Sequence, residues 1–256
     1  MLIDAHCHLD DEQFANDLDA VIARAADAGV SAIITAGADV SSSRAAVTVA
    51  EKCDGVYAVV GVHPEHADVF DGESLNAIRD LAQHRRVIGI GEIGLDFYWQ
   101  NNPPREMQTS ALIAQMDLAQ ELGKPVVIHD REAHAELMDI LVRRGGNPQG
   151  VLHCFSGDLE MARRAIDLGY YISFAGNVTF KNALHLQEIA RVMPLERIII
   201  ETDSPYLSPQ RGKRNEPANV ALVCSKIAEL KDSAISLVAE TTTHNIQLLF
   251  GLAQTE

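Results

Sequence analysis

Eight short runs rich in β-branched and apolar residues alternate along this chain with longer segments whose apolar residues recur at helical spacing. Such an alternation predicts parallel strands joined by crossover helices. Eight evenly spaced units with short linkers favour closure into a (β/α)8 TIM barrel over the alternative, an open doubly wound sheet. The predicted strands are 2–6, 31–37, 56–63, 87–94, 125–130, 151–155, 170–176 and 197–203.

The length and composition of the chain fit one enzyme-sized domain. A chain of 256 residues buries enough surface to fold without disulfides or a structural metal, and no Pro-, Gly- or Ser-rich linker divides it. We therefore expect residues 1–256 to form a single domain. The four cysteines are scattered without a CxxC pair, and neither a signal peptide nor a long apolar span is present, which predicts a cytoplasmic protein that does not enter a membrane.

The chain is strongly acidic, with a formal net charge of −15. That charge argues against a protein that coats nucleic acid in a general way, because such proteins carry basic surfaces. It leaves room for a phosphate-bearing substrate at one locally basic site.

Polar residues that can bind metal ions lie at or near the ends of the predicted strands, where TIM barrels keep their chemistry. His6 and His8 are two positions apart, so strand alternation turns both imidazoles toward the barrel mouth and turns Cys7 toward the helices. The other candidates, from strands further along the chain, are His63, Glu92, His129, His153 and Asp203.

Each of these residues alone has an ordinary structural explanation. A single histidine at a strand end is more often packed or hydrogen-bonded than a metal ligand, Glu92 could belong to a buried ion pair, and Asp203 could cap the next segment. Four histidines and two carboxylates that converge on one rim from five strands are harder to explain without metal, because burying such groups is costly. The set suits two divalent cations that share a bridging carboxylate.

Six motifs, in this order, resemble the successive motifs of the TatD family of metal-dependent hydrolases, which belongs to the amidohydrolase superfamily. They run from residue 4 to about residue 217 and read DAHCHLD, GVHPE, GEIGLDFYW, PVVIHDRE, HCFSG and ETDSPYL with RGKRNEP. An HxH pair alone opens many amidohydrolases, whereas the ordered set is specific. The resemblance implies a TIM-barrel nuclease that acts on DNA with two metal ions.

By position, the resemblance implies two ligand sets that share one carboxylate. One cation would be held by His6, His8, Glu92 and Asp203, and the other by Glu92, His129 and His153. Strand four offers Glu92 and no lysine, as the TatD group does, whereas many superfamily members bridge their metals with a carboxylated lysine. Ligands of this kind suit Zn, Mn, Ni or Mg to differing degrees.

Residues beside the expected ligands carry further hypotheses. Glu201 and Asp203 share a strand face, so Glu201 lies one layer below the site and either orients a ligand or forms a buried pair with Arg or Lys. In the segment HPEHAD, Glu65 stands where many relatives have a histidine, and His66 follows. This departure leaves His66 without an assigned role and does not affect His63.

The loops after the predicted strands hold residues suited to binding a substrate. Barrels often bind phosphate at the loops after strands seven and eight, and the basic candidates in such loops are Arg131, Lys181, Arg211, Lys213 and Arg214. Surface Lys and Arg are usually only solvated, so their clustering in an acidic chain is what makes them candidates. We also assign His63 to substrate binding.

An aromatic run in the loop DFYWQNN follows strand four and includes the only tryptophan of the chain. It could stack a nucleobase, a contact worth roughly 1–3 kcal/mol. It could equally fill the barrel rim, which is our expectation for Phe97, and we assign Tyr98 to substrate binding.

The function we predict is hydrolysis of DNA phosphodiester bonds, on single strands or ends and in an exonucleolytic mode. Two cations would lower the pKa of a shared water, with Asp203 accepting its proton and Glu92 as the second catalytic residue. An alternative keeps the site but changes the bond, as in an amide or ester hydrolase acting on aminoacyl groups; the basic RGKRN loop argues against small neutral amides. A third hypothesis is a non-catalytic metal- or nucleic-acid-binding protein, against which the complete ligand set argues.

Overall fold

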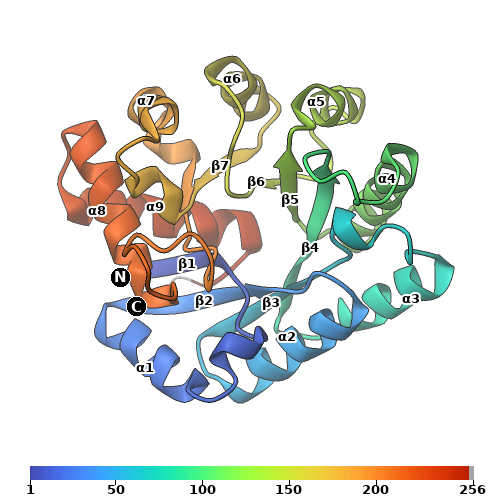
Figure 1. Cartoon of the computed structure of the whole chain (residues 1–256), viewed down its shortest axis with the longest axis horizontal. Helices are drawn as coiled ribbons and strands as arrows, with labels where there is room; N and C mark the ends of the chain where they lie inside the picture. The colour runs from blue at the N-terminus through green and yellow to red at the C-terminus, as the bar shows by residue number, and fades with distance from the viewer. Residues whose placement is uncertain (254–256) are drawn as a thin grey trace.

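The computed structural model describes residues 1–253. Its eight strands are parallel and hydrogen-bonded in chain order, and helices surround them (Figure 1). The predicted (β/α)8 barrel is therefore confirmed. The strands are β1 Leu2–Cys7, β2 Val30–Ala36, β3 Val56–Val60, β4 Val87–Asp96, β5 Val126–Arg131, β6 Gly150–Leu152, β7 Tyr171–Phe174 and β8 Ile198–Ile200.

Helices follow the strands and cover the outer face of the sheet. The helix over 105–122 shows how the local sequence sets the ends: Pro104 precedes it, and Gly123 ends it at φ 64°, a conformation that other residues adopt only at a cost. The α-helices are α1 Leu18–Asp27, α2 Val40–Lys52, α3 Gly72–Leu81, α4 Arg105–Leu122, α5 His134–Arg143, α6 Leu159–Asp167, α7 Leu184–Val192, α8 Val220–Lys231 and α9 Ile235–Phe250. The 3-10 helices are η1 Glu12–Phe14, η2 Pro64–His66, η3 Gly176–Thr179, η4 Leu195–Arg197 and η5 Pro217–Asn219.

Several strands end earlier than the sequence predicted. His63, His153 and Asp203 were expected on strands, but each lies in the segment that follows one. The backbone gives the reason for two of them: Cys154 has φ 43° and Asp203 has φ 57°, in the left-handed region that an extended strand excludes. The chain therefore leaves the sheet at these residues.

The barrel closes where β1 meets the segment after β8. The backbone N–H of Asp203 donates to the carbonyl oxygen of His6 at 2.9 Å, and that of His8 donates to Ser204 at 2.8 Å. Cys7 and Ser204 form an isolated parallel bridge between these bonds. Two distant parts of the sequence are thus held at fixed positions, and they are the parts that carry His6, His8 and Asp203.

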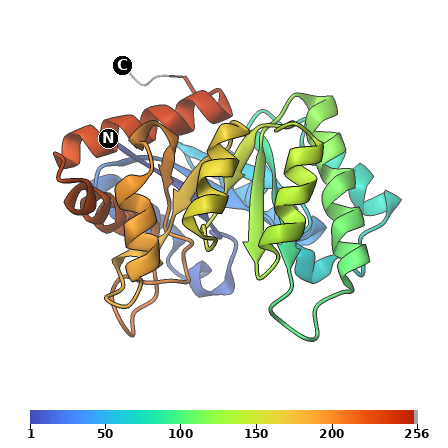
Figure 2. The ribbon, with the colours of Figure 1, turned by 90° about the horizontal axis from the view of Figure 1, so that it is seen from above.

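The last helix, α9, lies across the amino-terminal end of the barrel (Figure 2). Its Ile246 and Phe250 pack against inward-facing apolar residues of the strands, among them Ile3, Ile34 and Val59. Burial of this apolar cluster stabilises the closed end. The opposite end of the barrel, at the carboxyl ends of the strands, is the one that holds the polar residues.

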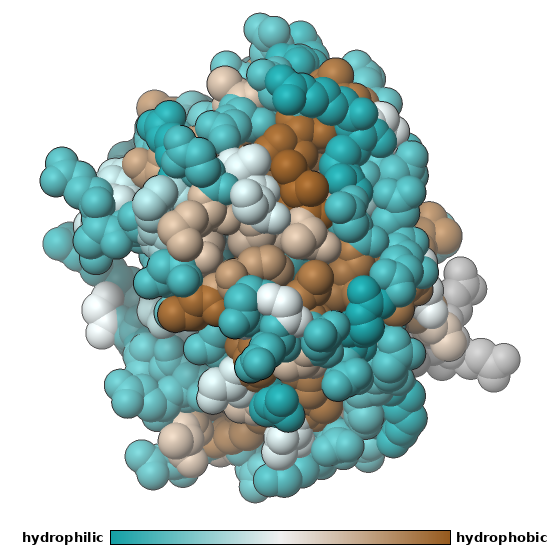
Figure 3. All heavy atoms as spheres, turned by 90° about the vertical axis from the view of Figure 1, so that its right-hand side faces the viewer, coloured by the Kyte–Doolittle hydropathy of each residue, from teal (hydrophilic) through white to brown (hydrophobic). Residues whose placement is uncertain are grey.

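The outer surface carries an apolar hollow that is separate from the barrel mouth. It lies between α3 and α4, on the face shown in Figure 3, and encloses about 540 Å³ among residues that include Phe70, Leu75 and Met107.

Among residues 1–253, no helix has the length and apolar character needed to cross a membrane.

Candidate metal centre

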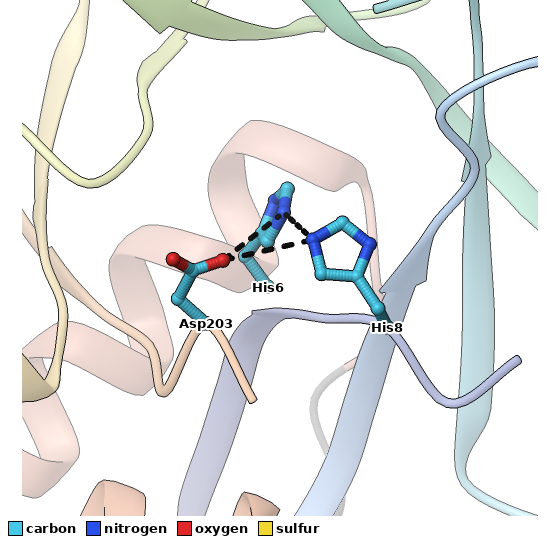
Figure 4. A group of neighbouring side chains, drawn as sticks. All are labelled: His6, His8 and Asp203. Carbon is cyan, nitrogen blue, oxygen red and sulfur yellow. Dashed lines mark hydrogen bonds and ion pairs between the residues drawn. The ribbon is translucent and has the colours of Figure 1, made fainter. Parts of the chain in front are cut away.

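Strand β1 and the residue that follows it bring two imidazoles to one point, as the HxH spacing predicted. Nε2 of His6 and Nε2 of His8 lie 3.3 Å apart, and Oδ1 of Asp203 lies 3.9 Å from the first and 3.6 Å from the second. Figure 4 shows the three side chains converging, with His6 on β1, His8 just after it and Asp203 in the segment after β8. This cluster is one that could hold a metal ion.

The carboxylate of Glu92 lies between this cluster and a second one. Its Oε2 is 3.2 Å from Nε2 of His6, while its Oε1 is 2.9 Å from Nδ1 of His129 and 3.3 Å from Nε2 of His153. Glu92 is only 4% exposed. Its two oxygens therefore face two groups of histidines, which is the arrangement expected of a bridging carboxylate.

Glycines in β4 and directly after β3 allow the backbone segments to approach closely around Glu92. A Cβ added at Gly91 would lie 2.7 Å from Cβ of Val127, and one added at Gly61 would lie 2.9 Å from the backbone of Gly91. Any larger residue would push the neighbouring strands apart. The residues GIGE thus place a carboxylate deep in the mouth because the glycines let β4 pack tightly.

The donor atoms fit divalent cations in both kind and spacing. Two ligand atoms that each lie about 2.1 Å from a tetrahedral ion are about 3.4 Å apart. Nε2 of His6 and Nε2 of His8 lie 3.3 Å apart, and each lies 3.2 to 3.9 Å from a carboxylate oxygen of Glu92 and of Asp203. Imidazole and carboxylate donors at these separations suit Zn, Mn, Ni or Mg. The division of these residues into two ligand sets stays a prediction.

Three of the histidines are fixed by an acceptor on the side away from the clusters. Nδ1 of His8 donates to the carbonyl oxygen of Ala36 at 3.1 Å, Nδ1 of His153 to Glu201 at 2.9 Å and Nε2 of His129 to Asp96 at 3.1 Å. A proton held on the outer nitrogen leaves the inner nitrogen's lone pair free for a cation.

Glu201 orients a candidate ligand, His153, which is the first of the two roles expected from the sequence. Its Oε1 accepts hydrogen bonds from His153 and from the backbone N–H of Cys154, and no Arg or Lys pairs with it within residues 1–253.

Asp96, which accepts the hydrogen bond from His129, was missed by the sequence reasoning. Its position four residues after Glu92, on the same face of β4, was the available signal.

The environment sets the charge of the histidines before any cation binds. Burial alone would lower the pKa of His8, but the hydrogen bond to Asp203 and the charge of Glu92 raise it to about 9. Burial likewise opposes the charged form of His129, yet the hydrogen bonds to Asp96 and Glu92 raise its pKa to about 9. Without metal, imidazolium groups therefore balance the carboxylates of the site.

The carboxylates remain ionised in this environment. Burial would raise the pKa of Glu92, but the surrounding histidines hold it well below its ordinary value. Burial also opposes ionisation of Asp203, and the hydrogen bond from His8 with the charges of His153 and His6 lowers its pKa. Asp203 is therefore able to accept a proton at neutral pH.

Two connected hollows open above the clusters. One encloses about 560 Å³ and is bordered by acidic residues, Asp10, Asp11 and Glu65, and by Trp99. The other encloses about 390 Å³ and reaches Cys154, Ser156, Asn177 and Leu207. The residues that border both hollows are His129, Arg131, His153, Asp203 and Tyr206. Together they form one mouth with a more acidic and a less acidic side.

The structure places the predicted substrate-binding residues at different distances from this mouth. Arg131 borders it and lies over the rings of Tyr98, at 3.9 Å, and Trp99, at 5.3 Å. His63 also borders it, while Phe97 packs against the core beneath Arg105. Lys181, Arg211 and Lys213 are exposed on the loops after β7 and β8 but border neither hollow.

Arg214 is turned away from the mouth. Its guanidinium donates to both carboxylate oxygens of Asp17, at 2.9 and 2.8 Å, and also to the backbone carbonyl of Gln13. We expected Arg214 to contact phosphate. In the structure, Asp17, in the loop before α1, already occupies its guanidinium and would compete with a phosphate. Trp99 and Tyr206, which border the mouth, were not assigned from the sequence; Trp99 had been noted only as part of the aromatic run.

Comparison with known proteins identifies the family. Residues 3–251 match the model of the TatD-related DNases. The chain belongs to the TatD family. The predicted resemblance is confirmed, and the protein is a metal-dependent hydrolase of the amidohydrolase superfamily.

Several TatD relatives align over nearly the whole chain. An uncharacterized metal-dependent hydrolase of Bacillus subtilis, YabD, is 40% identical over 98% of this chain and 100% of its own length. The 3'-5' ssDNA/RNA exonuclease TatD of Escherichia coli is 35% identical over 98% and 100%. The crystal structure of the TatD homologue YjjV from Escherichia coli superposes with a TM-score of 0.92 at 32% identity, covering 98% of both chains.

Proposed function

We propose that this TatD-family hydrolase cleaves phosphodiester bonds of DNA, on single strands or at ends, using two divalent cations. The position of Glu92 supports the proposal most directly, because one buried carboxylate faces both histidine clusters. Two-cation sites with a shared ligand are typical of phosphodiester hydrolases. The exonuclease relative from Escherichia coli supports the choice of substrate.

Different residues of the mouth would bind the cations and accept the proton. His6, His8, Glu92 and Asp203 would hold one cation, and Glu92, His129 and His153 the other. The cations supply Lewis-acid activation of water and of the phosphoryl group. Asp203, which is ionised and lies beside both hollows, accepts the proton of the attacking water.

Binding of the nucleic acid depends on Arg131 and on the aromatic rings beside it. Arg131 presents the guanidinium that borders both hollows, and it forms no ion pair within residues 1–253, so it is available to a phosphate. The rings of Tyr98 and Trp99, which lie beneath it, are about half exposed and can stack on a base. Lys181, Arg211 and Lys213 can contact phosphates further along a strand.

The acidic side of the mouth favours a second candidate function. Asp10, Asp11 and Glu65 repel phosphates but would attract the ammonium group of an aminoacyl ester or amide. The same cations would activate water toward a carbonyl carbon. This candidate uses the same cations but differs from the first in the bond that is broken and in the residues that bind the substrate.

One experiment separates the two functions. The protein is stripped with a chelator, reloaded separately with Zn²⁺, Mn²⁺, Ni²⁺ or Mg²⁺, and assayed on single-stranded DNA, duplex DNA, RNA and a panel of aminoacyl esters and carboxamides. Glu92→Gln serves as the matched inactive control. We expect metal-dependent release of nucleotides from single-stranded DNA. Turnover of esters or amides alone would overturn the nuclease proposal.

A further inference from the structure

His63 differs from the other histidines of the mouth in the partner of its outer nitrogen. The outer nitrogens of His8, His129 and His153 each contact an oxygen acceptor. Nδ1 of His63 instead accepts a hydrogen bond, at 3.2 Å, from the backbone N–H of Glu65 in η2, while the carboxylate of Glu65 lies beyond hydrogen-bond distance, with Oε2 at 3.9 Å. His63 thereby caps that short helix with its side chain.

This contact fixes which nitrogen of His63 carries the proton. A backbone N–H can only donate, so Nδ1 must present its lone pair to Glu65. The neutral imidazole then carries its proton on Nε2, the atom that faces Oε1 of Glu92 at 3.4 Å. A protonated nitrogen has no lone pair for a cation, so His63 does not act as a ligand through Nε2 although it belongs to a cluster with Glu92 and His129.

The N–H of His63 is held rigidly at the mouth. The residue is 8% exposed and borders the larger hollow beside Asp203 and Arg131. Its own backbone N–H donates to Ala38 at 2.8 Å, and Pro64 follows it directly at the start of η2. A donor fixed on both sides costs little to reorganise when a substrate arrives.

We propose that His63 is a catalytic residue whose Nε2–H donates a hydrogen bond to a phosphoryl oxygen of the substrate. It stabilises the negative charge that builds on that oxygen during hydrolysis, and no proton is transferred to or from the ring. In the structure, Nε2 of His63 faces Oε1 of Glu92 at 3.4 Å. A carboxylate that binds cations is a weaker acceptor, so we expect a substrate oxygen to accept this hydrogen bond instead. The inference rests on the proposed phosphodiester hydrolysis.

The first test does not depend on activity. Two-bond ¹H–¹⁵N correlation spectra of the Zn²⁺-loaded protein distinguish protonated, unprotonated and metal-bound ring nitrogens, and the His63 signals are assigned from their absence in His63→Asn. We expect a proton on Nε2 and none on Nδ1. The His63→Asn protein should keep the zinc content of the wild type, whereas His129→Asn should lose zinc. A zinc-bound Nε2, or loss of zinc from His63→Asn, would overturn the inference.

Two variants separate capping from catalysis. His63→Asn places an oxygen near the position of Nδ1 and so keeps the cap of η2, but it removes the donor at the mouth. His63→Gln loses the cap and places an amide N–H near the position of Nε2. On single-stranded DNA we expect His63→Asn to lower kcat by about 10²–10³, with little change in KM, and His63→Gln to recover at least tenfold of that loss.

The outcomes distinguish this inference from the proposed function. If the wild-type protein hydrolyses no phosphodiester with any of the four metals, the proposed function fails, and the catalytic role of His63 fails with it. If the wild type is active and His63→Asn retains full kcat, only the role of His63 is overturned. An equal loss in His63→Asn and His63→Gln would also count against it, because a hydrogen-bond donor should be partly replaceable.

Discussion

The carboxylate of Glu201 holds the imidazole of His153 through a 2.9 Å hydrogen bond to Nδ1. Glu201 is almost completely buried and is itself anchored by the backbone N–H of Cys154 at 2.7 Å. The ring of His153 therefore keeps Nε2 directed at Glu92 and stacks on His6 with ring centres 3.8 Å apart. Glu201, which forms a group that could hold a metal ion with His6 and His153, thus also fixes the orientation of the His153 ring.

We expect Glu201→Ala to weaken cation binding by about 10- to 100-fold, because His153 loses the acceptor that fixes its orientation. Glu201→Gln keeps an oxygen at the same place, so its cation affinity should fall by less than that of Glu201→Ala. Titration of the metal-free protein with Zn²⁺ against a competing chelator measures both. Unchanged affinity in Glu201→Ala would show that packing alone orients His153.

Asp203→Asn tests the proton acceptor. The amide can still offer an oxygen to a cation but has almost no basicity, so kcat should fall by about 10²–10⁴. Metal content and substrate binding should stay near those of the wild type, and added metal should not restore the rate. If activity instead returns with excess metal, Asp203 is only a ligand.

Arg131→Ala and Arg214→Ala should behave differently although both remove one guanidinium. Arg131 borders the mouth, whereas Arg214 is paired with Asp17. We expect Arg131→Ala to raise KM for single-stranded DNA and to reduce the slope of log affinity against log salt by about 1. Arg214→Ala should leave both unchanged and act on stability. Equal salt slopes in the two variants would contradict this assignment.

The metal-free protein should lose stability as the pH rises. The folded-state pKa values of His8 and His129 are raised from 6.5 to about 9. Their contribution is fully present below pH 6.5 and is lost as the pH rises through about 9, by linkage. Binding of a cation releases these protons, so metal affinity should increase over the same interval.

Urea unfolding of chelator-treated protein at pH values between 6.5 and 9 measures the first effect, and Zn²⁺ titration measures the second. His129→Gln, which cannot be protonated, provides the control and should show a flatter dependence. Stability that stays constant or rises across this interval would mean that these histidines are neutral in the metal-free protein.

Short-range sequence patterns determined the barrel and much of the candidate site. The alternation of strands and helices recurs within about 30 residues, so it can be seen without knowing any long-range contact. The spacing of His6 and His8 and the coincidence of polar residues at strand ends brought together the same side chains that converge in the structure. A barrel guarantees this convergence, because the carboxyl ends of its strands form one ring.

Only the tertiary structure decided which partners these residues have. Arg214 pairs with Asp17, which is 197 positions away, because α1 and the loop after β8 pack together. Likewise, only the fold shows that Asp96 accepts a hydrogen bond from Nε2 of His129. The turn into η2 also brings the backbone N–H of Glu65 to Nδ1 of His63. Sequence patterns specify which chemical groups reach the mouth. Their charge, tautomer and availability depend on atoms within hydrogen-bond distance, and those distances are set by the packing of segments that the sequence keeps far apart.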